Sequence, residues 1–274
     1  MQNTYNVGFI GGGNMASSII GGLIPDILPS NSVYVSDPNE AQLNKLAEQY
    51  AVQTCQDNNE LITRCDVIVL AVKPQIMQAV LVPIQQTLNN KNPLIISIAA
   101  GITCHSIESS IGLTAAIIRV MPNTPALLKS GASGLYANQN VTASQKDIAK
   151  TLMSAVGSAF WVHNESDIDT VTALSGSGPA YFMLFVHSLI TAAEKAGLPS
   201  DVAKQLAIDT CSGSAKLMSS SELPIQQLID NVTSPGGTTE QALLSFSNNQ
   251  FSEIVTQAFD SALKRSKELG EELR

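Results

Sequence analysis

The feature that most constrains the fold is a regular alternation of short apolar runs with helical periodicities over roughly the first 160 residues. A continuously apolar run such as 66–72 is typical of a strand that is covered on both faces. Strands that alternate with helices at this spacing need right-handed crossovers, which favour a mostly parallel, doubly wound α/β sheet. The predicted strands are 6–10, 32–36, 66–72, 94–99, 115–120 and 159–162, and the predicted helices among them are 40–50, 76–88, 106–110 and 143–156.

The pattern changes after His163, where no further strand is predicted. Helices are predicted at 181–196, 200–218, 225–231, 238–246 and 251–269. We therefore expect two domains, 1–163 with the sheet and 164–274 all helical. The segment 182–190 is apolar on more than one face, so that we expect these helices to pair between subunits.

Composition excludes several classes of protein. A net charge of −8 without a cluster of Lys or Arg argues against a nucleic-acid partner. The apolar runs are too short to span a bilayer and the N-terminus has no basic start or cleavage site, so we expect a soluble, cytoplasmic protein without membrane contact. The four cysteines and three histidines lie at unrelated spacings, which predicts buried thiols and no metal site.

A glycine-rich segment follows the first predicted strand and opens the first helix. Gly11, Gly13 and Ala16 occupy the informative places of G-x-G-x-x-G/A, with Asn14 and Met15 between them. Gly11 would allow the tight turn, Gly13 would let the backbone approach a pyrophosphate, and Ala16 would let helix and strand pack closely. The helix N-terminus would offer N–H groups to the anion, so the segment predicts a dinucleotide site.

The end of the second strand, Ser36-Asp37-Pro38, bears on which dinucleotide binds. Asp37 could accept hydrogen bonds from a ribose 2′-hydroxyl, which favours NADH, whereas Ser36 and backbone donors of the same loop could hold a 2′-phosphate. Asp37 could equally be the residue that starts the turn before Pro38. These alternatives stay open at this point.

Three further loops leave the carboxyl ends of predicted strands, where ligands bind in open α/β sheets. They are Ala71-Val72-Lys73-Pro74, Ala99-Ala100-Gly101 and the segment 119–125. The first two should line the cofactor crevice, with Lys73 in a supporting role. In the third, two prolines should present Asn123 and Thr124 rigidly to the crevice.

Two clusters of Gly, Ser and Pro, at 174–179 and 230–239, interrupt the helical part. Either one alone would be a capped turn between helices. The second exposes successive backbone N–H groups at a helix N-terminus, where a carboxylate can bind. Together with the dinucleotide fingerprint, the two clusters favour a small anionic substrate.

The segments FIGGGNMA, AVKP, SIAAG, RVMPNTPA, LSGSGPAY and DNVTSPGGTT occur in this order. In these motifs the chain resembles the pyrroline-5-carboxylate reductases from about Val7 to its last helix. The resemblance implies an NAD(P)-binding Rossmann-type domain, a helical domain that forms a homodimer, and often a larger ring of dimers. It also implies the last step of proline biosynthesis, in which NADPH, or alternatively NADH, reduces the C=N bond of 1-pyrroline-5-carboxylate to L-proline.

The resemblance assigns roles to individual residues. It implies that Thr239 approaches the imine nitrogen and orients it. The implied substrate-binding residues are Ser234, Gly236, Gly237, Thr238 and Thr239. The implied cofactor-binding residues are Gly11, Gly13, Asn14, Met15, Ser36, Asn58, Ala71, Val72, Lys73, Pro74, Ala99 and Asn231, of which Ser36 and Asn58 lie at the adenosine ribose.

Two rival interpretations remain. A dehydrogenase acting on a hydroxy acid would use a catalytic Lys or His in its helical domain, for which His187 and Lys195 are the candidates. A protein that only senses dinucleotides would have a damaged substrate loop, whereas 234–239 is intact.

Overall fold

The structure is a computed structural model that describes residues 5–112 and 114–272. The chain forms two compact units, one comprising the described residues up to Ser177 together with those from Ala262 onward, and the other Gly178–Ser261. The predicted boundary at 163/164, between a cofactor-binding and a substrate-binding domain, stays a prediction. The compact units divide later because 164–177 packs on the sheet of the first unit.

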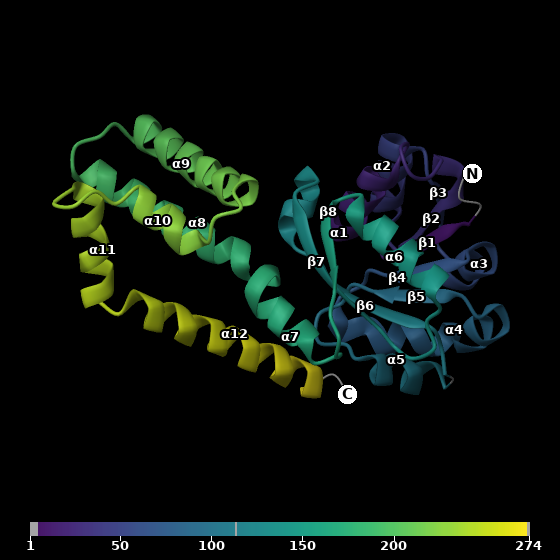
Figure 1. Ribbon diagram of the computed structural model, residues 1–274. Coiled ribbons are helices and arrows are strands. Elements are labelled where there is room, and N and C mark those ends of the chain that lie inside the picture. Colours follow the sequence, from purple (N-terminus) through teal and green to yellow (C-terminus); the bar gives the residue numbers. More distant parts are fainter. Residues whose placement is uncertain (1–4, 113, 273–274) are drawn as a thin grey trace. The chain divides into compact units, whose positions relative to one another are not determined.

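The first unit contains one eight-stranded sheet in the order β3-β2-β1-β4-β5-β6-β7-β8 (Figure 1). Neighbouring strands are parallel except for β6 and β7, which are antiparallel with Ile118 opposite Ala137. The strands are β1 (Val7–Ile10), β2 (Val33–Ser36), β3 (Gln53–Cys55), β4 (Val67–Leu70), β5 (Leu94–Ser97), β6 (Ile117–Met121), β7 (Gly131–Ala137) and β8 (Gly157–Trp161). The expected doubly wound, mostly parallel sheet is thus confirmed.

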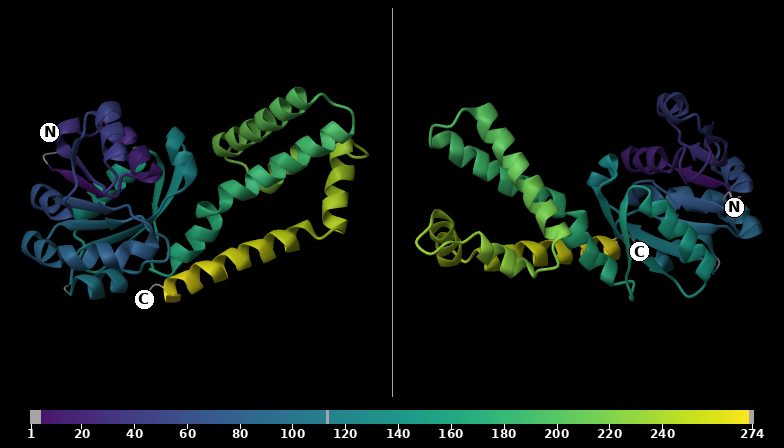
Figure 2. Two further views of the ribbon diagram at one scale, coloured as in Figure 1. Left: turned by 180° about the vertical axis from the view of Figure 1, so that it is seen from behind. Right: turned by 45° about the horizontal axis from the view of Figure 1, so that its top comes forward.

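Helices cover both faces of this sheet (Figure 2). On one face α1 (Asn14–Leu23), α2 (Glu40–Tyr50) and α6 (Ala143–Ser154) pack on a core that includes Phe9 and Val35. On the other face lie α3 (Asn58–Arg64), α4 (Met77–Lys91) and α5 (Cys104–Ile111). All four residues of β1, β4 and β5 are buried, which explains their continuous apolar sequence.

Local signals explain where these helices begin. The Asn39 side chain accepts hydrogen bonds from the backbone N–H groups of Ala41 and Gln42 at the start of α2. Thr142 and Gln145 form a capping box at the start of α6. Short 3₁₀ turns precede other elements: η1 (Ser30–Ser32), η2 (Pro74–Ile76) and η3 (Thr124–Leu128).

The segment after β8 also belongs to the first unit. It contains α7 (Asp167–Val171) and the π-helical turn η4 (Thr172–Gly176). Val171 packs so closely on Gly134 of β7 that a Cβ atom at Gly134 would lie 2.7 Å from it. The last turns of α12 (Phe251–Glu272) join the same unit, where the Ser266 hydroxyl donates to the Asp169 carboxylate at 2.7 Å.

The second unit is helical throughout, as expected. It comprises α8 (Gly178–Lys195), α9 (Ser200–Ser220), α10 (Ile225–Asn231), α11 (Thr238–Asn248) and the first part of α12. Many large apolar side chains are exposed in the single chain, for example Phe182, Leu206 and Ile254. The helical run Asp167–Lys195 would be long and apolar enough to cross a membrane by length and composition alone, and only 11% of its apolar window is buried.

Candidate active site

The glycine-rich loop lies where the carboxyl ends of three strands meet. Gly11 follows β1 with φ +97°, and its N–H donates to the Ser36 carbonyl at the end of β2 at 2.8 Å. A Cβ atom at Gly11 would lie 2.8 Å from the Ala71 carbonyl oxygen beyond β4. Only glycine meets both demands, so that its role follows from the close approach of the strands as well as from the turn.

The start of α1 is open to an anion. Gly13 is its N-cap, no side chain of the described residues caps it, and α1 has no acidic residue in its first turn. No described heavy atom lies within 4 Å of the Cβ position of Gly13, and Gly13 and Asn14 are exposed. Uncapped N–H groups with this open approach are what a pyrophosphate requires, so the residues present fit a dinucleotide.

Behind this opening the helix is anchored in the core. Ala16 is only 1% exposed, and Met15 is half-buried against the same apolar cluster. Of the predicted cofactor residues in the loop, Gly13 and Asn14 therefore face outward, and Met15 mainly packs.

Ser36, at the end of β2, is turned inward. It is 1% exposed, and its hydroxyl donates to the Asn58 side-chain oxygen. The two residues that the resemblance places at the adenosine ribose are thus next to each other. The Ser36 hydroxyl is used inside the fold, whereas the half-buried Asn58 remains partly accessible.

Asp37 has a partner in the glycine loop itself. Its Oδ2 accepts the Gly12 N–H at 2.8 Å, and its Oδ1 accepts the Asn39 N–H at 2.9 Å. The Gln42 side-chain amide donates to the Gly12 carbonyl from the other side. Asp37 therefore is a turn residue, as one of the two interpretations held, and it also fixes the glycine-rich loop.

The loops after β4 and β5 lie at the same edge. Ala71, Val72 and Pro74 are half-buried, and Lys73 is exposed as the N-cap of η2. Ala99 is buried, at 8% exposed, and donates to the Ser97 hydroxyl. Gly101 also packs closely on α12, since a Cβ atom there would lie 3.3 Å from the Gly270 backbone nitrogen, and its place in the cofactor crevice stays a prediction.

Asn123 does not face the crevice, contrary to the prediction. It is 8% exposed, its Nδ2 donates to the Ser175 carbonyl at 3.0 Å, and its Oδ1 accepts the Ala132 N–H at 2.9 Å. The prediction failed because it assumed that the two prolines hold the Asn123 side chain out toward the crevice. Instead, the Asn123 side-chain amide forms hydrogen bonds with residues that are distant in sequence or follow in the next strand. Thr124 is exposed, as expected.

The first Gly/Ser/Pro cluster forms the π-helical turn. The Ser177 N–H donates to the Thr172 carbonyl at 2.8 Å, five residues back. Gly176 lies close to the Met121 side chain, since a Cβ atom at this position would be 2.5 Å from the Met121 terminal methyl group. This wide turn holds the Ser175 carbonyl toward Asn123 and directly precedes α8.

The second cluster presents its backbone at the start of α11. Gly236 has φ +70°, and Gly237 is an N-cap without a capping side chain among the described residues. The Gly236 N–H is taken by the Glu240 carboxylate at 2.8 Å, and the Gly237 N–H by the Ser234 carbonyl at 2.9 Å. The loop therefore does bind a carboxylate, here one from its own chain.

Thr239 and its neighbours remain available. No hydrogen bond from the Thr239 hydroxyl to another described residue occurs, and this residue is half-buried, while Ser234 and Thr238 are exposed. Asn231 is exposed on α10 and accepts from the Gln227 amide at 3.1 Å. Asn231 and the substrate loop belong to the second unit and the other predicted cofactor residues to the first.

Sequence reasoning missed a buried ion pair. Arg119 on β6, at 4% exposed, binds Glu165 with 2.9 Å between Nη1 and Oε1, and the same oxygen accepts the Cys104 N–H at 2.7 Å. Burial raises the pKa of the Cys104 thiol, and Glu165 raises it further. An arginine inside an apolar strand was the available signal, because a buried guanidinium needs a carboxylate partner.

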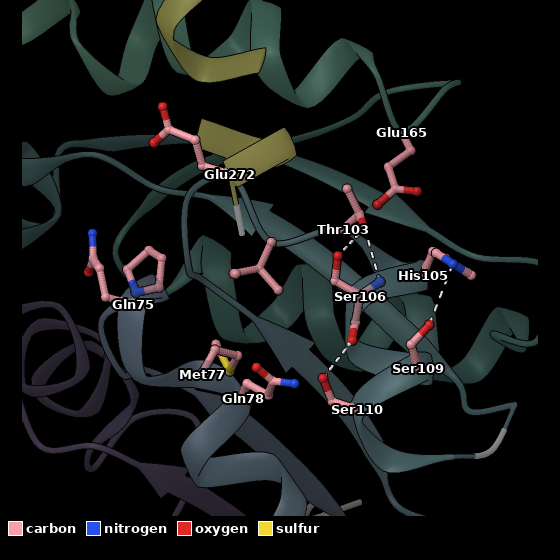
Figure 3. A pocket seen from close by; sticks show the side chains of 12 residues that line it. Gln75, Met77, Gln78, Thr103, His105, Ser106, Ser109, Ser110, Glu165 and Glu272 are labelled. Carbon is pink, nitrogen blue, oxygen red and sulfur yellow. Dashed lines mark hydrogen bonds between the residues drawn. The ribbon is translucent and has the colours of Figure 1, made fainter. Parts of the chain in front are cut away.

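A polar cavity of about 660 Å³ opens beside this ion pair (Figure 3). Its wall consists of the first residues of α4, the hydroxyl-rich face of α5 and the carboxylates of Glu165 and Glu272. Pro74 is the one predicted cofactor residue on its wall. The cavity therefore adjoins the predicted crevice without coinciding with it.

The comparisons with known proteins agree with this geometry. Residues 165–269 match the sequence model of the pyrroline-5-carboxylate reductase dimerisation family, and residues 6–101 match that of the NADP oxidoreductase, coenzyme F420-dependent family. A pyrroline-5-carboxylate reductase from Pseudomonas aeruginosa is 47% identical over 99% of both chains.

Solved structures are similar along their whole length. A pyrroline-5-carboxylate reductase from Coxiella burnetii is 41% identical, with a TM-score of 0.93 over 97% of this chain and 99% of that one. The pyrroline carboxylate reductase of Plasmodium falciparum, solved with NADP bound, is 34% identical, with a TM-score of 0.87 over 98% of this chain and 100% of that one. The chain therefore belongs to the pyrroline-5-carboxylate reductase family.

Proposed function

We propose that this protein reduces the C=N bond of 1-pyrroline-5-carboxylate to L-proline with NADPH or NADH, the last step of proline biosynthesis. The observation that carries the proposal is that the chain contains two loops that suit an anion. One is an open glycine-rich loop that fits a dinucleotide, and the other binds a carboxylate. The chain is also 47% identical to such a reductase. The first loop suits the cofactor pyrophosphate and the second loop suits the substrate carboxylate.

The reaction is balanced by one hydride and one proton. The bound nicotinamide would supply the hydride, which adds to the imine carbon, while the ring nitrogen takes up the proton. If the imine binds already protonated, no strong general acid is needed, and orientation supplies most of the catalysis. A neutral imine would need a proton from Thr239 or water, and a hydroxyl is a weak acid.

Within this proposal the residues have distinct tasks. The first turn of α1 and the loops after β4 and β5 hold the cofactor, with Asn231 near its nicotinamide ribose. Ser234, Gly236, Gly237 and Thr238 hold the substrate carboxylate, and Thr239 orients the imine nitrogen. Removal of the Glu240 carboxylate from the Gly236 N–H must precede or accompany binding of the substrate there.

We further propose how the protein assembles and where it acts. The match to the dimerisation family and the exposed apolar helices support a homodimer through the helical unit, with a ring of such dimers as a larger assembly. The apolar run Asp167–Lys195 falls wholly within that family match, which favours subunit pairing over a bilayer. The acidic net charge supports an enzyme without a nucleic-acid partner, and we propose that it acts in the cytoplasm.

The experiment that tests the function is oxidation of NADPH and, separately, NADH by the purified protein with 1-pyrroline-5-carboxylate, with identification of the product. We expect turnover and proline. A folded protein that binds dinucleotide but gives no proline with either cofactor would contradict the proposal. Unchanged turnover of Ala variants of His187 and Lys195 would dismiss the hydroxy-acid dehydrogenase alternative.

A further inference from the structure

We infer that Asp37 is a specificity-determining residue that favours NADH and penalises the 2′-phosphate of NADPH. The inference rests on the proposed function, because it assumes that the glycine loop binds a nicotinamide dinucleotide. An acidic residue at the end of the second strand of such a fold lies where the adenosine ribose binds. Asp37 occupies that place and contacts the glycine loop directly through Gly12.

Most of the backbone donors that a 2′-phosphate could use around this turn already have partners. The N–H groups of Gly12 and Asn39 donate to the Asp37 carboxylate, and those of Ala41 and Gln42 donate to the Asn39 side chain. Pro38 has no N–H to offer. A phosphate could bind these groups only by displacing bonds that hold the turn and start α2.

Ser36 was the side-chain donor expected for a 2′-phosphate, and its hydroxyl is not available either. Ser36 is 1% exposed, and its hydroxyl donates a hydrogen bond to the Asn58 side-chain oxygen. Rotating this hydroxyl outward would leave the Asn58 oxygen without its donor, at a cost in free energy.

The charge of the turn opposes a second anion. Asp37 and Glu40 are acidic, and between Ser36 and Tyr50 the one cationic side chain is Lys45, which is exposed more than one helical turn beyond Glu40. Glu40 also offsets the positive end of the α2 dipole that would otherwise attract a phosphate. A phosphate of about −1.5 to −2 charge would therefore meet uncompensated carboxylates.

A ribose 2′-hydroxyl, in contrast to a 2′-phosphate, can donate a hydrogen bond to the Asp37 carboxylate. A carboxylate can accept about four hydrogen bonds. Each Asp37 oxygen accepts one backbone N–H from the described residues, so both retain capacity for a donor. The 2′-hydroxyl of NADH supplies such a donor, whereas a phosphate ester at that position does not.

The test is calorimetric titration of the full-length protein with NADPH and with NADH, in the absence of substrate. We expect the wild-type protein to bind NADH about 10- to 100-fold more tightly. In Asp37→Asn, whose amide oxygen can still accept the Gly12 N–H, NADPH should bind more tightly and NADH more weakly than in the wild type. A residue that merely held the loop in shape would weaken both when replaced.

Glu40→Gln is the matched control, because it removes the same charge from the same turn without a bond to the glycine loop. Glu40 also repels the phosphate, but from an exposed position, so the preference for NADH over NADPH should fall by no more than about threefold, less than in Asp37→Asn. Wild-type binding of NADPH as tight as that of NADH overturns the inference whatever the variants do. Weakening of both dinucleotides in Asp37→Asn, or an equal shift in Glu40→Gln, also overturns it. If the folded wild-type protein bound neither dinucleotide, the proposed function would fail as well.

Discussion

Glu240 occupies a backbone donor that the proposed reaction needs for its substrate. Its carboxylate accepts the Gly236 N–H at 2.8 Å, from the first turn of the helix that the loop precedes. The substrate carboxylate has the same charge and the same acceptor atoms. Two carboxylates cannot share one N–H, so Glu240 and the substrate compete for the start of α11.

We expect Glu240→Ala to lower the KM for 1-pyrroline-5-carboxylate by about 3- to 10-fold, because the competing bond costs the substrate about 1 kcal/mol. Steady-state kinetics at saturating dinucleotide would measure this. Glu222→Ala, which removes the same charge from an exposed loop of the same unit, should leave the KM unchanged. A KM that rises in Glu240→Ala would mean that Glu240 helps to bind the substrate.

Thr239 is the residue on which orientation of the imine depends in the proposed mechanism. We expect Thr239→Ala to lower kcat/KM by roughly 10- to 1000-fold, since a hydrogen bond made to the reacting nitrogen is lost in the transition state. The matched control is Thr233→Ala, whose hydroxyl donates to the Ile229 carbonyl at 2.7 Å. Kinetics of Thr239→Ala like those of the wild type would remove Thr239 from the mechanism.

At the residue scale, the loops of the candidate site could be predicted from the sequence better than the directions of their side chains. Backbone roles such as those of Gly11 and Gly13 follow from local chemistry and were predictable. The inward amides and hydroxyls were not, because Asn123 depends on Ser175 and Ser36 on Asn58, which are distant in sequence. Whether the predicted contacts to cofactor and substrate occur stays a prediction.

At the scale of elements, three partly buried polar links tie the segment 165–175 to the rest of the first unit. They are Arg119 with Glu165, Ser266 with Asp169, and Asn123 with Ser175. π-helical turns are rare and often occur at functional sites. This one is followed directly by α8, the first helix of the second unit.

We expect Asn123→Ala to lower the free energy of unfolding by roughly 2 to 4 kcal/mol, because it leaves the Ser175 carbonyl and the Ala132 N–H without their partner. Denaturation in urea at a fixed protein concentration would measure the loss. Asn90→Ala, on the exposed side of α4, should change it by no more than about 0.5 kcal/mol. A loss below about 1 kcal/mol in Asn123→Ala would show that the link is replaced by water.

The junction of α3 with β4 predicts a dependence of stability on alkaline pH. Burial raises the pKa of the Cys65 thiol from 9.0 to about 12. The contribution of the Cys65 thiol to the free energy of unfolding is fully present below pH 9. It falls as the pH rises from 9 toward 12, because the thiol ionises in the unfolded chain at a lower pH than in the folded one, and this ionisation favours the unfolded chain. Between pH 8 and pH 10 Cys65→Ala should lose about 1 kcal/mol less free energy of unfolding than the wild type. Equal losses in both would contradict the assignment.

The elements themselves were largely predictable, and the exceptions have physical causes. Every predicted strand and helix is present, with shifts of a few residues at the ends. The sequence analysis missed β3, α3, β7 and α7. The first two are short, with three and seven residues, and β7 contains glycines and pairs antiparallel beside a parallel sheet. The π-helical turn has no periodicity of its own that a sequence pattern could reveal.

At the scale of the whole molecule, the chain combines a self-contained sheet unit with a helical unit that leaves many apolar side chains exposed. The alternation of strands and helices predicted the first unit because its contacts are mostly between neighbouring elements. The return of α12 to the first unit was not predictable, since it depends on Gly101 and Gly270 meeting across the fold. Membership of a family with a dimerisation domain explains the exposed apolar faces as surfaces for oligomerisation.

The most direct test of the central claim follows one hydrogen atom. The protein would be incubated with 1-pyrroline-5-carboxylate and NADH or NADPH that carries deuterium at both positions of the nicotinamide C4, and the product analysed by mass spectrometry and NMR. The proposed function predicts proline with a single deuterium on the ring carbon that was part of the C=N bond. Proline without deuterium, or oxidised dinucleotide without proline, would contradict it.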